Sequence, residues 1–519
     1  MSRLASYARL IGVAVVLIRA DALLPRELDP LLPPAMRAVA RLLRLFSGRQ
    51  AREGRPGERL AAALERLGPV AIKLGQLLST RADIFGGDFA EDLSRLKDRL
   101  PPFPADEAKA EIAAALGAPF ETLFTAFEDA AAGASLAQAH RATHASGKDV
   151  AVKVLRPGIE GRVAADVAAL REGARLAEAW APASRRLAPR AFAETVIRAL
   201  ELELDLRFEA AGADELRAVM AHDGYMRAPA VCWEGVAKRV LTLEWAPGAP
   251  LSDPAALTTP GLDRPTLANN LVRAFLAQAL DHGVFHADLH EGNLFVAPPA
   301  RLTAVDFGIV GRLGPGERRY LAEILWGFLR RDYARVARVH FEAGYVPAHH
   351  DEAAFAQALR AVGEPVFGLK ASDVSMGRLI AQLFEITALF DMRLRPELVL
   401  LQKTMVTVEG VARRIHPEHD LWAAAEPVVA RWIARELSPA ARLRELARDA
   451  RAAVGALARL AEPEGGSELS QPAPAESSPT QAAAVARTAD HPAIWFFAGA
   501  AVSALAFVLA VTFRLLGAR

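Results

Sequence analysis

The chain has 519 residues, of which 52% are hydrophobic, and its 62 basic residues nearly balance its 61 acidic ones. A length and hydrophobic content of this order predict roughly two to four domains. The charge balance gives no electrostatic case for nucleic acid as a partner. Cys232 is the only cysteine in the sequence, which excludes a disulfide within the chain.

The N-terminal region, residues 1–56, carries an apolar run that is too short to cross a bilayer. Only residues 10–18 are continuously apolar before Arg19, whereas a spanning helix needs about 20 such residues. We therefore expect an amphipathic helix that is interfacial or docks on the core, rather than an export signal.

A helical extension is predicted over residues 57–120. Its residues 70–73 read VAIK, which resembles the strand that carries a phosphate-binding lysine in kinases. The sequence continues into LGQLL, a helical pattern, so Lys73 is expected on a helix surface.

Residues 121–248 contain a better candidate for that strand. Residues 148–154 read KDVAVKV, a β-rich run that follows a loop of small residues and holds Lys153. The alanine-rich segment 130–138 favours a helix on composition alone.

Acidic residues follow on a segment that we predict to be one helix. On it Glu201, Asp205 and Glu209 share a face, and like charges so spaced repel one another unless a cation is near. Lys153, Lys73 and Mg²⁺ are the candidate cations. Because kinases pair the strand lysine with a helix glutamate, either Glu203 or Glu209 should pair with Lys153.

The next predicted elements run from the end of this region into residues 249–461. A strand over 239–245 breaks at residues 246–248, where a hinge could offer backbone groups to adenine. A helix is predicted over 266–282 with Gly283 as its C-cap. Two short strands follow, over residues 294–296 and 302–305.

The most specific motif lies around these strands. Residues 286–293 read HADLHEGN, and residues 306–308 read DFG. ATP phosphoryl transfer needs a strand lysine for the α- and β-phosphates, a loop aspartate for the acceptor proton, and an asparagine and an aspartate for Mg²⁺. We assign these roles to Lys153, Asp288, Asn293 and Asp306.

Two motifs of protein kinases are missing from the sequence. Ala287 replaces the arginine that reads a phosphorylated activation loop, and no Ala-Pro-Glu follows the DFG triplet. The chain instead enters a predicted helix over residues 317–323. A protein substrate is therefore disfavoured.

The C-terminal part predicts a tethered membrane anchor. Residues 462–491 are rich in Glu, Pro, Ser, Gly and Ala, which predicts a disordered linker. Residues 492–516 are predicted to be a transmembrane helix, because 493–513 carry no charge. ATP chemistry places the catalytic body on the cytoplasmic side of a bacterial inner membrane.

Several long strings resemble the UbiB family of atypical kinase-like proteins of ubiquinone (coenzyme Q) biosynthesis. They are GPVAIKLGQLLSTRAD at 68–83, RYLAE at 319–323 and LVLLQKTM at 398–405, within a similarity that extends from about 57 to about 435. The resemblance implies an α+β, two-lobed protein-kinase-like fold with a helical N-terminal extension, joined here to the C-terminal transmembrane helix. Bacterial members usually have two membrane-spanning segments, whereas this sequence shows one.

The resemblance also implies roles for two further segments. The extension would lie across the active site, with Lys73 and Gln76 as gating residues and the acidic residues Glu203, Asp205 and Glu209 as ion-pair partners. An alanine-rich loop would replace the glycine-rich loop over the phosphates and handle nucleotide differently, since a Cβ restricts the backbone. That loop comprises Ala130, Ala131, Ala132, Gly133, Ala134, Ser135, Leu136, Ala137 and Gln138.

The motifs predict a membrane-anchored, ATP- and Mg²⁺-dependent phosphotransferase-like enzyme. The resemblance implies that it supports ubiquinone biosynthesis, with ATP hydrolysis coupled to a partner. The expected partners are a membrane lipid or quinone precursor and the enzymes of ubiquinone biosynthesis. Two alternatives remain open: a catalytically silent nucleotide-binding scaffold, and a kinase of small molecules.

Overall fold

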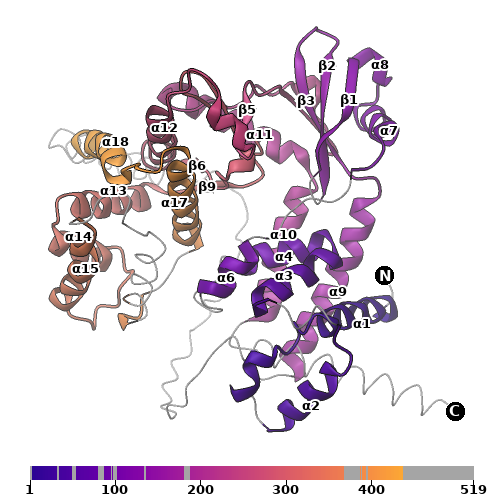
Figure 1. Cartoon of the computed structure of the whole chain (residues 1–519), viewed down its shortest axis with the longest axis horizontal. Coiled ribbons are helices and arrows are strands. Elements are labelled where there is room, and N and C mark those ends of the chain that lie inside the picture. The colour runs from indigo at the N-terminus through magenta and orange to yellow at the C-terminus, as the bar shows by residue number, and fades with distance from the viewer. Residues whose placement is uncertain are drawn as a thin grey trace, which may run out of the picture.

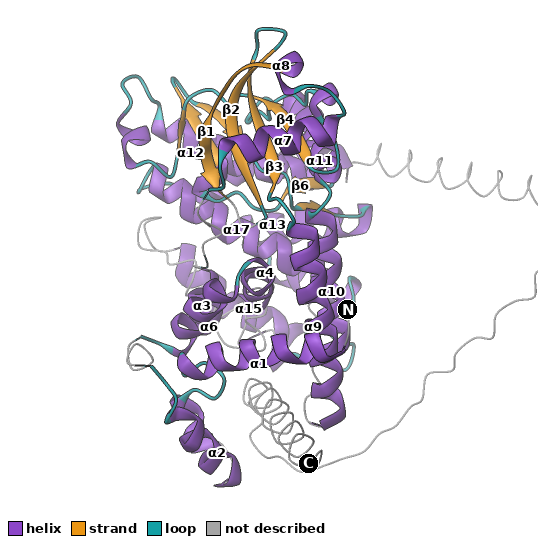
Figure 2. Ribbon diagram, turned by 90° about the vertical axis from the view of Figure 1, so that its right-hand side faces the viewer, coloured by secondary structure: helices purple, strands orange, loops and turns teal. Residues whose placement is uncertain are grey.

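The structure is a computed structural model with a β-sheet lobe, the upper lobe, and a largely helical body. The sheet lies at the top of Figure 2 and at the upper right of Figure 1. The structure describes residues 3–31, 34–48, 54–79, 87–94, 96, 102–133, 136–180, 188–367, 386, 389–392 and 396–436.

The upper lobe is built on one antiparallel sheet of order β1-β2-β3-β4. Alternate residues of β3 (Val150, Val152 and Val154) are fully buried against helices α7 and α8, as expected for a strand with one face on the core. Lys153 therefore points to the opposite face. The elements are β1 (Phe124–Gly133), β2 (Ala137–His144), β3 (Asp149–Leu155), β4 (Val240–Glu244), α7 (Ala105–Leu116) and α8 (Phe120–Leu123).

This sheet confirms two strand predictions and rules out the helix that composition alone favours for the described part of residues 130–138. The predicted strands over 148–154 and 239–245 correspond to β3 and β4. The described residues of the alanine-rich segment are not helical: residues 130–133 end β1, Leu136 lies in a bend, and Ala137 and Gln138 begin β2, with Gly133 paired to Gln138. The pairing of these strands across the sheet overrides the helix preference of alanine.

Two long helices form an arm between β3 and the next helix, α11. α9 (Ile159–Trp180) and α10 (Pro189–Glu203) pack against each other, and α11 (Leu206–Asp223) then returns beneath the sheet. The predicted single helix carrying Glu201, Asp205 and Glu209 is therefore wrong.

The helix is interrupted at Asp205 by a hydrogen bond to another segment and by a side-chain cap. The Leu206 N–H donates to Lys238 O at 2.9 Å instead of continuing the α10 ladder. Asp205 is extended, with φ −128°, and its side chain accepts from the Arg207 N–H, which is the capping role that aspartate favours. The three acidic residues therefore do not share one helix face.

The N-terminal helices pack on the lower end of this arm (Figure 2). Tyr7 Oη on α1 lies 2.6 Å from Glu172 Oε1 on α9, and Arg9 contacts Asp166 of the same helix. This packing agrees with the core-docking alternative for the first helix. The helices of this region are α1 (Arg3–Arg19), α2 (Pro34–Arg44), α3 (Pro56–Leu67), α4 (Pro69–Ser79) and α6 (Gly87–Ser94), with a 3₁₀ turn over Arg26–Leu31.

The lower lobe surrounds the predicted catalytic motif with helices. The predicted helix 266–282 is confirmed: α12 (Arg264–Ala277) continues as a π-turn, η6 (Gln278–His282), and ends at Gly283 with φ +71°. The predicted strands 294–296 and 302–305 form a hairpin, β7 (Leu294–Ala297) with β8 (Arg301–Ala304).

The other elements of this lobe complete its core. The predicted helix 317–323 lies within α13 (Pro315–Leu329). The remainder are β5 (Ala249–Pro250), β6 (Val284–His286), β9 (Val310–Arg312), α14 (Tyr333–Glu342), α15 (Glu352–Phe367), α17 (Pro396–Ile415) and α18 (Leu421–Glu436), with 3₁₀ turns over Trp233–Gly235, Pro254–Thr258 and Glu291–Asn293.

The predicted linker, 462–491, and the predicted anchor, 492–516, lie outside the described residues. Within the part of the chain that is described, no helix combines the length and apolar character needed to cross a bilayer.

Candidate active site

Lys153 is the centre of a cluster of charges between the two lobes. Its Nζ lies 2.8 and 2.9 Å from the two carboxylate oxygens of Glu209 and 3.4 Å from Asp306 Oδ1. The side chains of Lys153 and Glu209 are only 22% and 9% exposed, whereas that of Asp306 is 45% exposed. The structure thus joins residues from β3, from α11 and from the DFG triplet.

Burial and charge act in opposite directions on this cluster. Burial opposes the charged form of Lys153, but the Asp306 and Glu209 carboxylates outweigh it and raise the Lys153 pKa. Burial raises the pKa of Glu209 to about 7, although Lys153 favours its ionised form. Lys153 lowers the pKa of Asp306. The lysine is therefore held as a cation, as phosphate binding requires.

Asp306 and Asn293 have the chemistry of a Mg²⁺ site. Val305 N–H donates to Asn293 O at 2.9 Å, which brings the two side chains to the same loop junction. Asn293 Nδ2 donates to Asp288 O at 3.0 Å, so the amide oxygen is the atom it can offer to a cation. A carboxylate and an amide oxygen are ligands that suit this hard ion.

Asp306 has an unusual backbone conformation. Its φ of +61° lies in the left-handed region, which residues other than glycine adopt at an energetic cost. The Gly308 N–H approaches Asp306 Oδ1 at 3.4 Å. The turn directs the carboxylate towards Lys153.

His286 positions the loop that carries Asp288, a role that the sequence did not reveal. The ring is fully buried; its Nδ1 accepts from the Asp288 N–H at 3.1 Å, and its Nε2 lies 3.2 Å from Val305 O. These partners fit a neutral ring protonated at Nε2, in agreement with the pKa that burial lowers. The only available signal was the position of His286 at the start of the motif.

Thr404 is a second residue that the sequence did not assign to the site. It lies on α17, and its Oγ1 is 3.1 Å from Ala287 O in the loop before Asp288. Its position in the LVLLQKTM string was the available signal. A helix from the C-terminal part of the chain thus supports the catalytic loop.

The alanine-rich segment lies between β1 and β2, and Ala139, the residue that follows it, pairs with Lys153 across the sheet. Ala134 and Ser135 lie outside the described residues, and Leu136 and Ala137 are buried. Gln138 is turned to another partner: its Oε1 accepts from Phe103 N and its Nε2 donates to Phe103 O, at 2.9 and 3.0 Å. Its side chain therefore anchors the segment before α7.

The N-terminal extension reaches the charge cluster through an ion pair. Lys73 of α4 contacts Glu203 at the end of α10, and Glu203 in turn contributes to the electrostatic field at Lys153 and Glu209. Gln76 lies on the same helix, one turn further on. Asp205 is not a member of the charge cluster around Lys153, because its carboxylate is paired with Arg207 at 2.7 Å.

A four-stranded sheet lobe, a lysine–glutamate pair and a loop aspartate beside a DFG turn define a protein-kinase-like phosphotransferase fold. The family description "ABC1 atypical kinase-like domain" matches residues 95–340, and "UbiB helical domain" matches residues 359–420. The chain belongs to this UbiB family of atypical kinase-like proteins.

Individual relatives agree with this assignment. A Marinobacter nauticus protein named "Probable protein kinase UbiB" is 41% identical over 395 residues, covering 75% of this chain and 72% of that protein. An Azotobacter vinelandii protein of the same name is 39% identical over 453 residues, covering 86% and 84%.

A solved structure shares the fold. A Mycobacterium tuberculosis protein determined in complex with erythromycin superposes with a TM-score of 0.50 at 21% identity, covering 76% of this chain and 98% of that one. At this identity the likeness concerns the fold alone.

Proposed function

We propose that this chain is a membrane-anchored, Mg²⁺- and ATP-dependent enzyme that supports ubiquinone biosynthesis by hydrolysing ATP in concert with a lipid or a biosynthetic partner. The observation that carries the proposal is the Lys153 cluster, in which the lysine contacts both Glu209 and Asp306. The names of the relatives support the biosynthetic role.

Each residue has a defined task in this reaction. Lys153 would bind the α- and β-phosphates, and Asn293 and Asp306 would hold Mg²⁺, which neutralises the phosphate charge when bound. Asp288, with a side chain about one-third exposed, would accept a proton as water attacks the γ-phosphorus. The β–γ bridging oxygen leaves with ADP.

Product analysis with γ-labelled ATP tests the reaction. Wild type should release inorganic phosphate in the presence of Mg²⁺, and Asp288→Asn should bind nucleotide but release far less. Label in a small molecule would favour the small-molecule kinase instead. Equal ubiquinone levels in cells that carry wild type or Asp288→Asn would favour the scaffold.

We also propose that α4 gates the site through the Lys73–Glu203 pair. Lys73→Ala should change nucleotide preference or autophosphorylation, with little effect on the melting temperature. The matched control is Lys109→Ala, since Lys109 also pairs with a carboxylate, that of Asp106, but has a side chain 39% exposed. A variant with wild-type turnover and nucleotide selectivity would contradict the gate.

Membrane attachment has its own test. Deletion of residues 492–519 should release the protein from membranes while the catalytic body stays folded. Continued sedimentation of the whole population with membranes would place the anchor elsewhere in the chain.

A further inference from the structure

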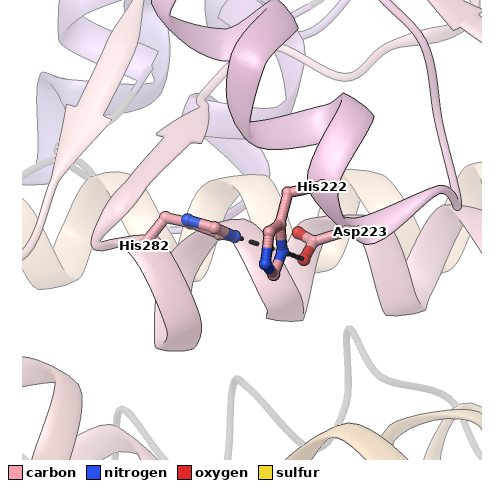
Figure 3. Close-up of side chains that lie close together, drawn as sticks. All are labelled: His222, Asp223 and His282. Carbon is pink, nitrogen blue, oxygen red and sulfur yellow. Dashed lines mark hydrogen bonds and ion pairs between the residues drawn. The ribbon is translucent and has the colours of Figure 1, made fainter.

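A cluster of two histidines and one aspartate lies away from the Lys153 site, at the other end of α11 (Figure 3). His222 and Asp223 are the last two residues of α11, and His282 is the last residue of η6. One candidate ligand atom from each of the three residues lies within 4.8 Å of the others. The three side chains come from two separate elements and point to one another.

The geometry of the cluster suits a metal ion. His222 Nδ1 and His282 Nε2 both lie 3.2 Å from the same oxygen, Asp223 Oδ1. Ligand atoms placed tetrahedrally at about 2 Å from one ion are separated by about 3.3 Å. The two nitrogen–oxygen separations match that spacing.

Asp223 gives a second, independent indication of a ligand. Its side chain is only 5% exposed, and its Oδ2 has no hydrogen-bond partner among the described residues. A buried carboxylate oxygen without a partner is costly, and a bound cation would compensate it.

Asp223, rather than the nearby Asp281, is the carboxylate available to a metal ion. Asp281 is adjacent to His282 in sequence, but Arg431 and Arg435 pair with it at 3.0 and 2.7 Å. The cluster therefore combines two imidazole rings with one carboxylate. His222, with a side chain 76% exposed, leaves the ion open to water as a further ligand.

We propose that His222, Asp223 and His282 bind a divalent transition-metal ion of the zinc class. Two imidazole nitrogens and one carboxylate oxygen favour Zn²⁺, Co²⁺ or Ni²⁺ over Mg²⁺, which prefers oxygen ligands. The site is thus chemically distinct from the one formed by Asn293 and Asp306.

The ion would tie α11 to the catalytic loop. Glu209 lies near the start of α11, and the helical rise from Glu209 to His222 is about 20 Å. His282 closely precedes His286, which positions Asp288. A metal bridge between His222 and His282 would fix the far end of α11 against the segment that leads into the catalytic loop.

Zinc binding to the full-length protein tests the site. The protein is stripped of metal with a chelator and titrated with Zn²⁺ against a chromogenic competitor, with Mg²⁺ in excess. Wild type should bind one Zn²⁺ at this site, and His222→Gln and His282→Gln should each weaken that binding by at least about tenfold. Equal zinc affinity in wild type and both variants would overturn the proposal.

A second histidine cluster provides the matched control. His349 and His350 lie 3.8 and 3.2 Å from Asp391, whose side chain is 69% exposed and thus well hydrated. His350→Gln should leave the high-affinity zinc site intact. Loss of zinc binding in this variant alone would assign the ion to the control cluster and refute the proposal.

Two further measurements separate coordination from misfolding. Co²⁺ bound to wild type should give a ligand-field spectrum that His282→Gln loses while its circular dichroism stays unchanged. Zn²⁺ should slow amide exchange at the C-terminal turn of α11 severalfold in wild type and not in His282→Gln. Unchanged exchange in wild type would overturn the tethering role.

Discussion

The Glu209 carboxylate is buried and forms an ion pair with Lys153. Replacement by glutamine keeps the shape of the side chain but removes the charge that orients Lys153. Hydrogen bonds between charged groups are worth about 1.5–3 kcal/mol, and each 1.4 kcal/mol or so corresponds to tenfold in rate.

Glu209→Gln should therefore lower Mg²⁺-dependent ATP turnover roughly tenfold or more. Asp214→Asn is the matched control, because Asp214 lies on the same helix with its side chain 46% exposed. Turnover is measured at saturating ATP. A similar loss in both variants would trace the effect to the helix rather than to the ion pair.

His419 is a buried residue with consequences for pH dependence. It is 3% exposed, and neither ring nitrogen has a hydrogen-bond partner among the described residues. Burial lowers its pKa to about 4, from about 6.5 in an unfolded chain. As pH falls through this interval, His419 takes up a proton in the unfolded chain but stays neutral in the folded protein.

The contribution of His419 to stability is therefore present above about pH 6.5 and is lost as pH falls towards 4. The slope is at most about 1.4 kcal/mol per pH unit. In urea unfolding, His419→Gln should show a shallower loss of stability over this range than wild type. His349→Gln, at a side chain 67% exposed, should behave as wild type; a matching slope in all three would contradict the assignment.

At the scale of the element, Gly248 lies between β4 and β5, in the segment that the sequence predicts to be a hinge. Its φ is +98°, and an added Cβ would lie 2.2 Å from Val296 O on β7. Gly147 provides a comparison, because its φ of +83° is similar but no atom lies within 4 Å of the position of its Cβ.

Gly147→Ala should cost only the conformational penalty, about 1–2 kcal/mol. Gly248→Ala should cost distinctly more and weaken nucleotide binding, because the hinge and the β5–β7 pairing must move. Denaturant unfolding and nucleotide affinity check both effects. Equal losses of stability would mean that the close approach to Val296 has no energetic consequence.

Local sequence patterns predicted those elements that depend on neighbours along the chain. The helix before Gly283, the hairpin β7–β8 and the strand holding Lys153 all follow from periodicity and turn residues. The break at Asp205 was missed because its cause is a hydrogen bond to Lys238, on another segment.

The supporting contacts of the site could not be predicted for the same reason. Gln138 binds Phe103, 35 residues away, and Thr404 binds Ala287, 117 residues away. Residue identities indicated the phosphoryl-transfer motif itself. Only the folded chain shows which segments support it, since such long-range partners leave no local pattern.

At the scale of the whole molecule, α17 links the C-terminal helices to the catalytic loop. Thr404 is fully buried, and its Oγ1 lies 2.8 Å from Leu400 O as well as 3.1 Å from Ala287 O. Thr404→Val should lower ATP turnover at temperatures well below melting, because it removes the support of the loop before Asp288.

Thr407→Val is the control, since Thr407 Oγ1 binds only Lys403 O on its own helix among the described contacts. It should leave turnover within about twofold of wild type, because the loop before Asp288 keeps its partner. If both valine variants lose turnover in proportion to their loss of stability, the proposed support of the catalytic loop by Thr404 is contradicted.

The docking of α1 on α9 also has a consequence for synthesis. Leu60, Leu64 and Ile72 are buried in a cluster that includes Phe192 of α10 at its edge. The buried members of this cluster all come from residues 22–96, whereas Phe192 emerges from the ribosome about 100 residues later, a delay of about 5–20 s at a chain growth of about 5–20 residues per second. During that interval the side of these helices that meets α9 and α10 has no cover, so we expect the nascent chain to bind chaperones before it can bind any nucleotide.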